Sequence, residues 1–224
     1  MKNKKLGTWV HEDAFDKFYV SGQDDPILNT MKDSVRVMRS VVDRCASTTE
    51  TILKNEMQTH VKNMRDAASY NYAQFMKAAP AIDEANRIAR SEIDRIVKET
   101  SAPTSTPYDS EVRSSLKSMS QKDREATIEN AIANGEDAVV AAILYGPAML
   151  SGIPDSQREL YRERWRARRF PHELQRQRRL ESAVKVLTGL SKFAMDHVLA
   201  LTDAKAVRRA EQSEIEARAA IYAV

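Results

Sequence analysis

Residues 31–52 read MKDSVRVMRSVVDRCASTTETI, and their apolar or small side chains return at alternating spacings of four and three. The stripe consists of Met31, Val35, Met38, Val42, Cys45, Thr49 and Ile52. This is the spacing of one face of an α-helix, and it resembles a heptad repeat. A second stripe runs from Val61 to Ile96 with its phase shifted by two positions. The shift indicates a stutter or a local break around Glu56 and His60.

The first stripe lies in a long segment without helix-breaking residues. Asp24 or Asp25 followed by Pro26 predicts a helix start, and neither Gly nor Pro follows until Pro80. A single helix over 26–79 would measure roughly 80 Å, which exceeds the diameter of a compact protein of this mass, so other subunits would have to cover its stripe. Proline should kink the helix or reverse the chain near Pro80. The threonines at 48, 49, 51 and 59 leave open the alternative of two shorter antiparallel helices.

Composition also favours helices. The 224 residues include only 6 Gly and 7 Pro, which effectively excludes a β-sandwich or barrel because such folds need many turns. We therefore expect an all-α, elongated protein. The mean hydropathy of −0.54 and the lack of a long apolar run predict no transmembrane helix. The N-terminus lacks the apolar stretch of a signal peptide, and the single cysteine, Cys45, indicates a reducing cytoplasm.

We predict four regions along the chain. Residues 1–25 form an N-terminal arm, residues 26–99 a helical or coiled-coil stalk, residues 100–108 a linker that begins TSAPTSTP, and residues 109–224 a C-terminal module of shorter helices. The prolines and the Ser and Thr residues make the linker an extended hinge. In the arm, Trp9, Phe15 and Tyr19 are candidate anchor residues. They either dock on the chain's own long helix or insert into a neighbouring subunit.

Capping residues divide the C-terminal module into short helices. Helices are expected to begin at Asp109 or Ser110, at Ser120, at Asp137, at Asp155 or Ser156, at Pro171 and near Ala204. Gly135 and Gly146 are expected to end two of them.

No catalytic or metal-binding pattern is present in the sequence. The four histidines, His11, His60, His172 and His197, fall on separate predicted elements without ligand-like spacing. Neither a phosphate-binding glycine loop nor a GxSxG motif occurs. We therefore expect a protein that is not an enzyme and that needs neither a cofactor nor a metal.

The strongest local signal is the segment 158–179, RELYRERWRARRFPHELQRQRR, which contains nine arginines and no lysine. Arginine combined with aromatic residues is typical of protein interfaces, whereas unopposed guanidinium groups would neutralise the phosphates of a nucleic acid. Glu159, Glu163 and Glu173 interrupt the positive field and favour the protein interface; an ordinary solvated face remains a third interpretation. The candidate partner-binding residues are Arg158, Tyr161, Arg162, Trp165, Arg166, Arg169 and Phe170.

A second signal is the nearly uncharged segment around residues 138–156. It is either the core of the C-terminal module or an exposed docking surface, and the density of Val, Ile, Leu and Met favours the core.

Residues 131–171 read AIANGEDAVVAAILYGPAMLSGIPDSQRELYRERWRARRFP. This stretch resembles uncharacterised helical proteins encoded among the virion genes of tailed bacteriophages, over about residues 110–180. The resemblance lies in the turn at Gly135–Asp137, the apolar helix that stops at Gly146 and Pro147, the LSG at 150–152 and the arginine-rich helix. It implies a component of a phage particle or of its assembly, and it carries over no functional residues.

From the stripe and the resemblance we expect a non-enzymatic structural subunit of a phage capsid, neck or tail, made in the bacterial host cytoplasm and located in the virion. Its partners would be other virion subunits or further copies of itself, with no membrane involved. The candidate oligomerisation seam consists of Val35, Met38, Val42, Cys45 and Ile52. Two alternatives are a nucleic-acid-binding packaging or regulatory protein with a coiled-coil stalk, and a transient assembly scaffold.

Overall fold

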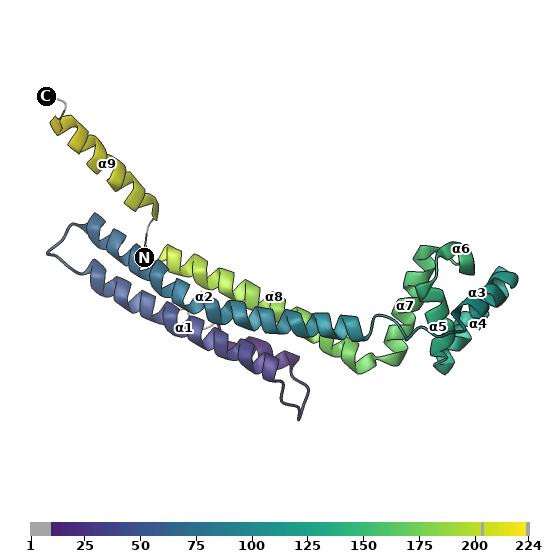
Figure 1. Ribbon diagram of the computed structural model, residues 1–224. Coiled ribbons are helices and arrows are strands. Elements are labelled where there is room, and N and C mark those ends of the chain that lie inside the picture. The colour runs from purple at the N-terminus through teal and green to yellow at the C-terminus, as the bar shows by residue number, and fades with distance from the viewer. Residues whose placement is uncertain (1–9, 203, 223–224) are drawn as a thin grey trace. The chain divides into compact units, whose positions relative to one another are not determined.

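The computed structural model describes residues 10–202 and 204–222, and within these ranges the chain is helical without a β-strand (Figure 1). The elements are η1 (Glu12–Phe18), α1 (Pro26–Leu53), α2 (His60–Glu99), α3 (Asp109–Ser118), α4 (Gln121–Asn134), α5 (Asp137–Tyr145), α6 (Ala148–Ser151), α7 (Asp155–Arg169), α8 (Pro171–Ala200) and α9 (Ala204–Tyr222). The expected all-α class is confirmed.

The chain divides into two compact units. Unit 1 contains the described residues up to Arg90 together with those from Leu180 onward, and unit 2 contains residues 91–179. This division differs from the predicted one, in which residues 109–224 formed a single module. The second half of α8 instead belongs with the N-terminal helices, because its apolar face packs there.

The chain reverses direction at residues 54–59, where the sequence led us to expect either a continuous helix or a local break. The Met57 amide donates to the Asn55 side chain at 3.0 Å, and the Asn63 side chain donates to the Asn55 carbonyl at 2.7 Å. At the start of α2, the Thr59 hydroxyl accepts a hydrogen bond from the Lys62 amide. These Asn and Thr side chains replace the glycine or proline that usually marks a turn. The alternative of two shorter helices is therefore the one that the structure adopts.

Of the two outcomes expected near Pro80, the reversal is wrong, because Pro80 lies inside α2, and the kink stays a prediction. Proline leaves the carbonyl four residues earlier, that of Met76, without its helical donor. Pro80 and Met76 are both exposed, so water can satisfy this carbonyl. A proline on the solvent side of a helix packed along its opposite face does not have to end that helix.

The stripe of α1 is covered by helices of the same chain. Val35, Met38, Val42 and Cys45 are fully buried, and Ile52 is half-buried. Cys45 Sγ lies 3.9 Å from the Asn71 carbonyl oxygen of α2, and the Asn71 side chain donates to Thr49 at 2.8 Å. Figure 1 shows α1, α2 and α8 side by side, and residues of α2 and α8 line a common groove. The proposed oligomerisation seam is therefore the core of unit 1, and the expectation that other subunits must cover it is corrected.

The N-terminal arm folds back on α1. Phe15 is fully buried, and the Tyr19 hydroxyl donates to the Asn29 side chain at 2.5 Å. Glu12 accepts a hydrogen bond from Arg36 at 3.2 Å, which ties η1 to the same helix. Phe15 and Tyr19 are thus engaged within the chain, as the first of the two interpretations expected. Trp9, the third candidate anchor residue, lies outside the described residues.

Unit 2 packs five short helices around one apolar core, with α5 in contact with α3, α4 and α7. The core consists of Leu116, Ile128, Ile132, Val140, Ile143, Leu144, Ile153, Tyr161 and Trp165. The predicted linker is part of this unit. Its Ser105 and Thr106 hydroxyls donate to the buried Asp109 carboxylate at 2.6 and 2.7 Å. It is therefore a packed connection where the sequence predicted an extended hinge.

Candidate protein-binding surface

The arginine-rich helix α7 turns its aromatic side chains inward. Trp165 is only 2% exposed, its indole N–H donates to Asp137 at 2.8 Å, and its ring meets that of Phe170 edge to face with the centroids 5.4 Å apart. Tyr161, one turn earlier on the same face, is also buried. A side chain that fills the core cannot anchor a partner. The expectation that the aromatic rings of Tyr161 and Trp165 anchor a partner is therefore corrected, and Phe170 is half-buried against the same core.

Most arginines of this segment are paired within the chain. At least five of them form ion pairs: Asp155 binds Arg158, Glu159 binds Arg162, Glu129 binds Arg164, Glu92 binds Arg176 and Asp137 binds Arg169. Arg166 donates to the Thr100 hydroxyl at 2.9 Å and to the Gln177 side chain at 3.2 Å. Arg169 is exposed and lies 3.7 Å from Asp137. The segment therefore connects parts of unit 2 and does not present an unopposed positive stripe.

Three arginines bind backbone carbonyls at the ends of short helices. Arg124 donates to the carbonyls of Leu116, Met119 and Gly152 at 2.8, 3.1 and 2.6 Å. Arg113 donates to the Ala142 carbonyl at 3.2 Å, and Arg158 donates to the Gly146 carbonyl. The last carbonyls of a helix have no partner within it and carry partial negative charge, so a cation there is stabilising. These contacts fix the turns that follow α3, α5 and α6.

Two glycines leave room for these arginines. A Cβ atom on Gly146 would lie 2.5 Å from Cδ of Arg113, and one on Gly152 would lie 2.6 Å from Nη1 of Arg124. Gly152 also has a φ of +69°, in the left-handed region. The backbone therefore favours glycine at position 152, and a side chain at position 146 would displace the Arg113 side chain.

The arginine-bound turns hold an exposed apolar group outside the core. Tyr145, Met149 and Leu150 are 55%, 76% and 45% exposed, while Val140, Ile143, Leu144 and Ile153 of the same segment are buried. We call Tyr145, Met149 and Leu150 the α5–α6 apolar group. The sequence favoured the core for this whole segment, and the structure divides it between core and surface. Helix α6 has only four residues, too few to bury every apolar side chain of the turn.

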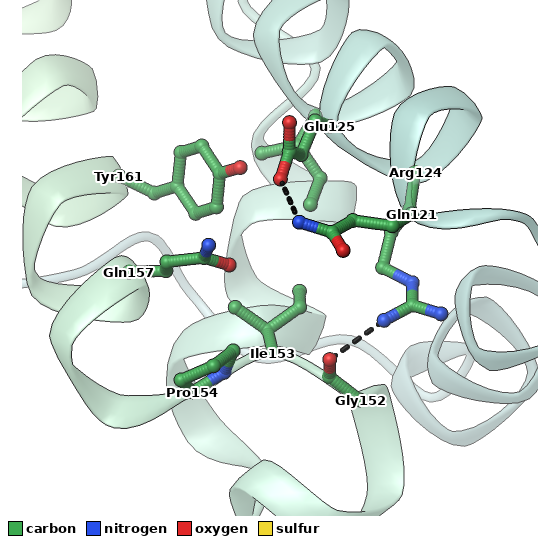
Figure 2. A pocket seen from close by; sticks show the side chains of 9 residues that line it. Gln121, Arg124, Glu125, Gly152, Ile153, Pro154, Gln157 and Tyr161 are labelled. Atoms are coloured by element: carbon green, nitrogen blue, oxygen red, sulfur yellow. Dashed lines mark hydrogen bonds between the residues drawn. The ribbon is translucent and has the colours of Figure 1, made fainter.

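A pocket of about 300 Å³ opens between α4 and the start of α7 (Figure 2). Its residues are Gln121, Arg124, Glu125, Ile128, Gly152, Ile153, Pro154, Gln157 and Tyr161. Gln121 donates to Glu125 across one turn of α4 at 2.9 Å. Burial raises the pKa of the Tyr161 hydroxyl, and the carboxylates of Glu125 and Glu129 raise it further. The hydroxyl is therefore neutral at physiological pH and able both to donate and to accept.

Sequence reasoning missed the residues of this pocket. Gln121, Glu125 and Ile128 recur at helical spacing on α4, and Gln157 and Tyr161 do so on α7. Spacing places each set on one helix face, yet it does not indicate that the two faces meet. Of these residues, only Tyr161 was a candidate partner-binding residue, and it was chosen because it lies in the arginine-rich segment.

The described residues contain no group of His, Cys, Asp and Glu side chains arranged to hold a metal ion. Among the same residues, no helix combines the length and hydropathy of a membrane-spanning segment. Comparison of the chain with protein-family models, curated proteins and solved structures found no match.

Proposed function

We propose that the protein is a non-enzymatic structural subunit of a tailed-phage particle and that it binds a neighbouring subunit through unit 2. The observation that carries this proposal is the α5–α6 apolar group. Exposed apolar side chains that follow one another within a few residues of a folded unit suit a protein interaction site when they form a patch.

The arginine hydrogen bonds that hold the backbone around this group favour binding. The carbonyls of Ala142, Gly146 and Gly152, which bracket the group, accept hydrogen bonds from Arg113, Arg158 and Arg124. A surface whose backbone is already fixed loses little conformational freedom when it binds. The resemblance to phage virion proteins spans this same turn, which is why we place the neighbouring subunit in a phage particle.

The pairing of the arginines weighs against the nucleic-acid alternative. Binding to a nucleic acid gains from each phosphate that a basic side chain neutralises, and the arginines of α7 would first have to leave their carboxylate and carbonyl partners. Binding of duplex DNA that weakens steeply with salt would revive this alternative.

Mass spectrometry of purified mature particles tests the proposal. We expect the chain in particles made by a phage that encodes it. Its presence only in immature particles would identify a scaffold instead, and its absence from both would contradict the proposal.

A substitution in the α5–α6 apolar group tests the surface itself. Met149→Glu places a charge where we expect an apolar contact, so incorporation into particles should fall while the chain stays folded. Met57→Glu is the matched control, because Met57 is 92% exposed in the reversal of unit 1. Equal incorporation of the two variants would contradict a role for this surface.

A further inference from the structure

The pocket between α4 and α7 contains polar groups that the fold does not use. Tyr161 is 5% exposed, and Figure 2 shows its hydroxyl directed into the pocket. Within residues 10–202 and 204–222, neither this hydroxyl nor the side-chain amide of Gln157 has a hydrogen-bond partner. The Tyr161 ring is buried while its hydroxyl and the half-buried Gln157 side chain remain accessible from the pocket. Their position at the mouth of a pocket leaves both groups available to hydrogen-bond a ligand.

Glu125 adds a charge with unused capacity. One of its oxygens, Oε1, accepts from Gln121, and in the described part of the chain no cationic side chain pairs with this carboxylate. The neighbouring Glu129 differs, since it is bound to Arg164. A carboxylate can accept about four hydrogen bonds, so Glu125 is free to receive more donors.

Among the described residues that line the pocket, the one cation, Arg124, is already engaged. Arg124 directs Nε, Nη1 and Nη2 to three backbone carbonyls. Its guanidinium therefore serves the ends of α3 and α6 and leaves Glu125 without a counter-charge.

The remaining lining is apolar. Ile128 and Ile153 are buried, and Pro154 is an exposed part of the lining. A volume of about 300 Å³ lies at the lower end of the range for small-molecule sites and is sufficient for one long side chain. An occupant that fits has an aliphatic stem for the two isoleucines and several N–H donors at its tip.

We propose that this pocket receives one arginine side chain of a partner protein. The guanidinium donates to the Glu125 carboxylate and to the oxygen atoms of Tyr161 and Gln157, while the stem packs on Ile128 and Ile153. Arginine suits the site better than lysine because its planar head directs five donors to separate acceptors. The inference deepens the proposed function and rests on it in one respect, namely that the partner is a protein.

Titration of the isolated full-length chain with two blocked peptides tests the inference. The probe is Ac-Ala-Ala-Arg-Ala-Ala-NH2, and the control contains citrulline, which has nearly the same shape without the charge. We expect the arginine peptide to shift the methyl NMR signals of Ile128 and Ile153 and to bind about tenfold more tightly than the citrulline peptide, as a charge-assisted hydrogen bond predicts. Equal affinity of the two peptides would overturn the inference.

Three variants locate the binding. Glu125→Gln should weaken the arginine peptide about tenfold, and Tyr161→Phe, which keeps the buried ring, should weaken it by a smaller factor of about three. Glu129→Gln is the matched control, because it makes the same change one turn further along α4 outside the pocket. If the Glu125 and Glu129 variants lost the same affinity for the arginine peptide, the binding would be general charge attraction and the inference would be overturned. Thermal unfolding of each variant establishes that it is folded.

The peptide experiment and the particle experiment fail independently. If the chain is present in particles but its pocket does not bind the arginine peptide, the proposed function stands and this inference is overturned. If the chain is absent from particles but its pocket binds the arginine peptide more tightly than the citrulline peptide, the arginine site stands and the proposed place in a virion is overturned.

Discussion

Unit 1 and unit 2 are both helical, but they differ in how many helix ends they must satisfy. The long helices α1, α2 and α8 have 28, 40 and 30 residues. Those of unit 2 between α3 and α7 have 4 to 15. Each helix leaves about four carbonyls unpaired at its C-terminal end. For its size, unit 2 therefore has more carbonyls than unit 1 that lack a hydrogen-bond partner within their own helix.

Arginine is used differently in the two units as a result. In unit 1, Arg87 pairs with Glu84 on its own helix, and Arg36 pairs with Asp33 on its own helix and with Glu12 of η1. In unit 2, Arg113, Arg124 and Arg158 donate to carbonyls of other elements. An arginine-rich sequence among short helices is therefore not by itself evidence for an external anion or partner.

Removing the largest core side chain of unit 2 should have the greatest effect on stability. We expect Trp165→Ala to lower the free energy of unfolding of unit 2 by about 3–5 kcal/mol, because it leaves a large cavity. Hydrogen exchange of α5 and α7 would measure the loss. Tyr72→Ala is the control, since Tyr72 is an exposed aromatic residue of unit 1. A Trp165 variant as stable as the wild type would mean that the side chain lies on the surface.

The role of arginine in unit 2 is tested by Arg124→Met, which keeps most of the stem and removes the donors. Loss of three hydrogen bonds to carbonyls should cost about 2–3 kcal/mol in the free energy of unfolding, measured by urea denaturation. Lys122→Met removes the same charge from an exposed position of α4 and should change stability by less than about 0.5 kcal/mol. Similar values for both variants would contradict a special role for Arg124.

Glycine-to-alanine substitutions should have opposite signs in the two units. Gly152→Ala should destabilise the protein by about 1–3 kcal/mol, because a side chain is strained at positive φ and would meet Arg124. Gly189→Ala lies inside α8 with open space at the new Cβ, so it should stabilise by about 0.5–1 kcal/mol. Thermal unfolding measures both. If both variants shifted the unfolding temperature in the same direction, the backbone conformation of one of the two glycines would be wrongly assigned.

The smallest expected effect concerns His197 in unit 1. Burial lowers the pKa of His197, and nearby Asp43 opposes this shift. As the pH falls below about 6.5, the unfolded chain binds the proton first. The contribution of His197 to stability is therefore complete above that pH and is lost as the pH falls toward the folded-state pKa.

His197→Gln should make unfolding less sensitive to pH between about 7 and 5, as measured by urea denaturation at several pH values. An unchanged slope in the His197 variant would contradict the assignment.

Local chemistry in the sequence predicts most helix ends. Asp25 caps α1 through the Ile27 amide, and Ser120 caps α4 through the Asp123 amide. Gly135 is the C-cap of α4. Such ends depend on residues within one turn of each other, which is why a single sequence identifies them.

Features that depend on distant residues were not predictable in the same way. The phase shift between the two stripes indicated a stutter or a break near residue 56, yet nothing local showed that helices of the same chain would cover the α1 stripe. The expected surface position of Trp165 failed for a related reason. Arginine stems cover apolar surface, so a helix rich in arginine can have a buried face.

The central claim is that the α1 stripe packs within its own chain. Asn71→Cys adds a thiol to α2 beside Cys45, the single natural cysteine, whose Sγ lies 3.9 Å from the Asn71 carbonyl oxygen. Labelled (15N) and unlabelled chains of this variant are unfolded, mixed, refolded and treated with a short thiol cross-linker. We expect linked peptides that are either fully labelled or fully unlabelled. Linked peptides that join a labelled half to an unlabelled half would mean that the stripe is covered by another subunit.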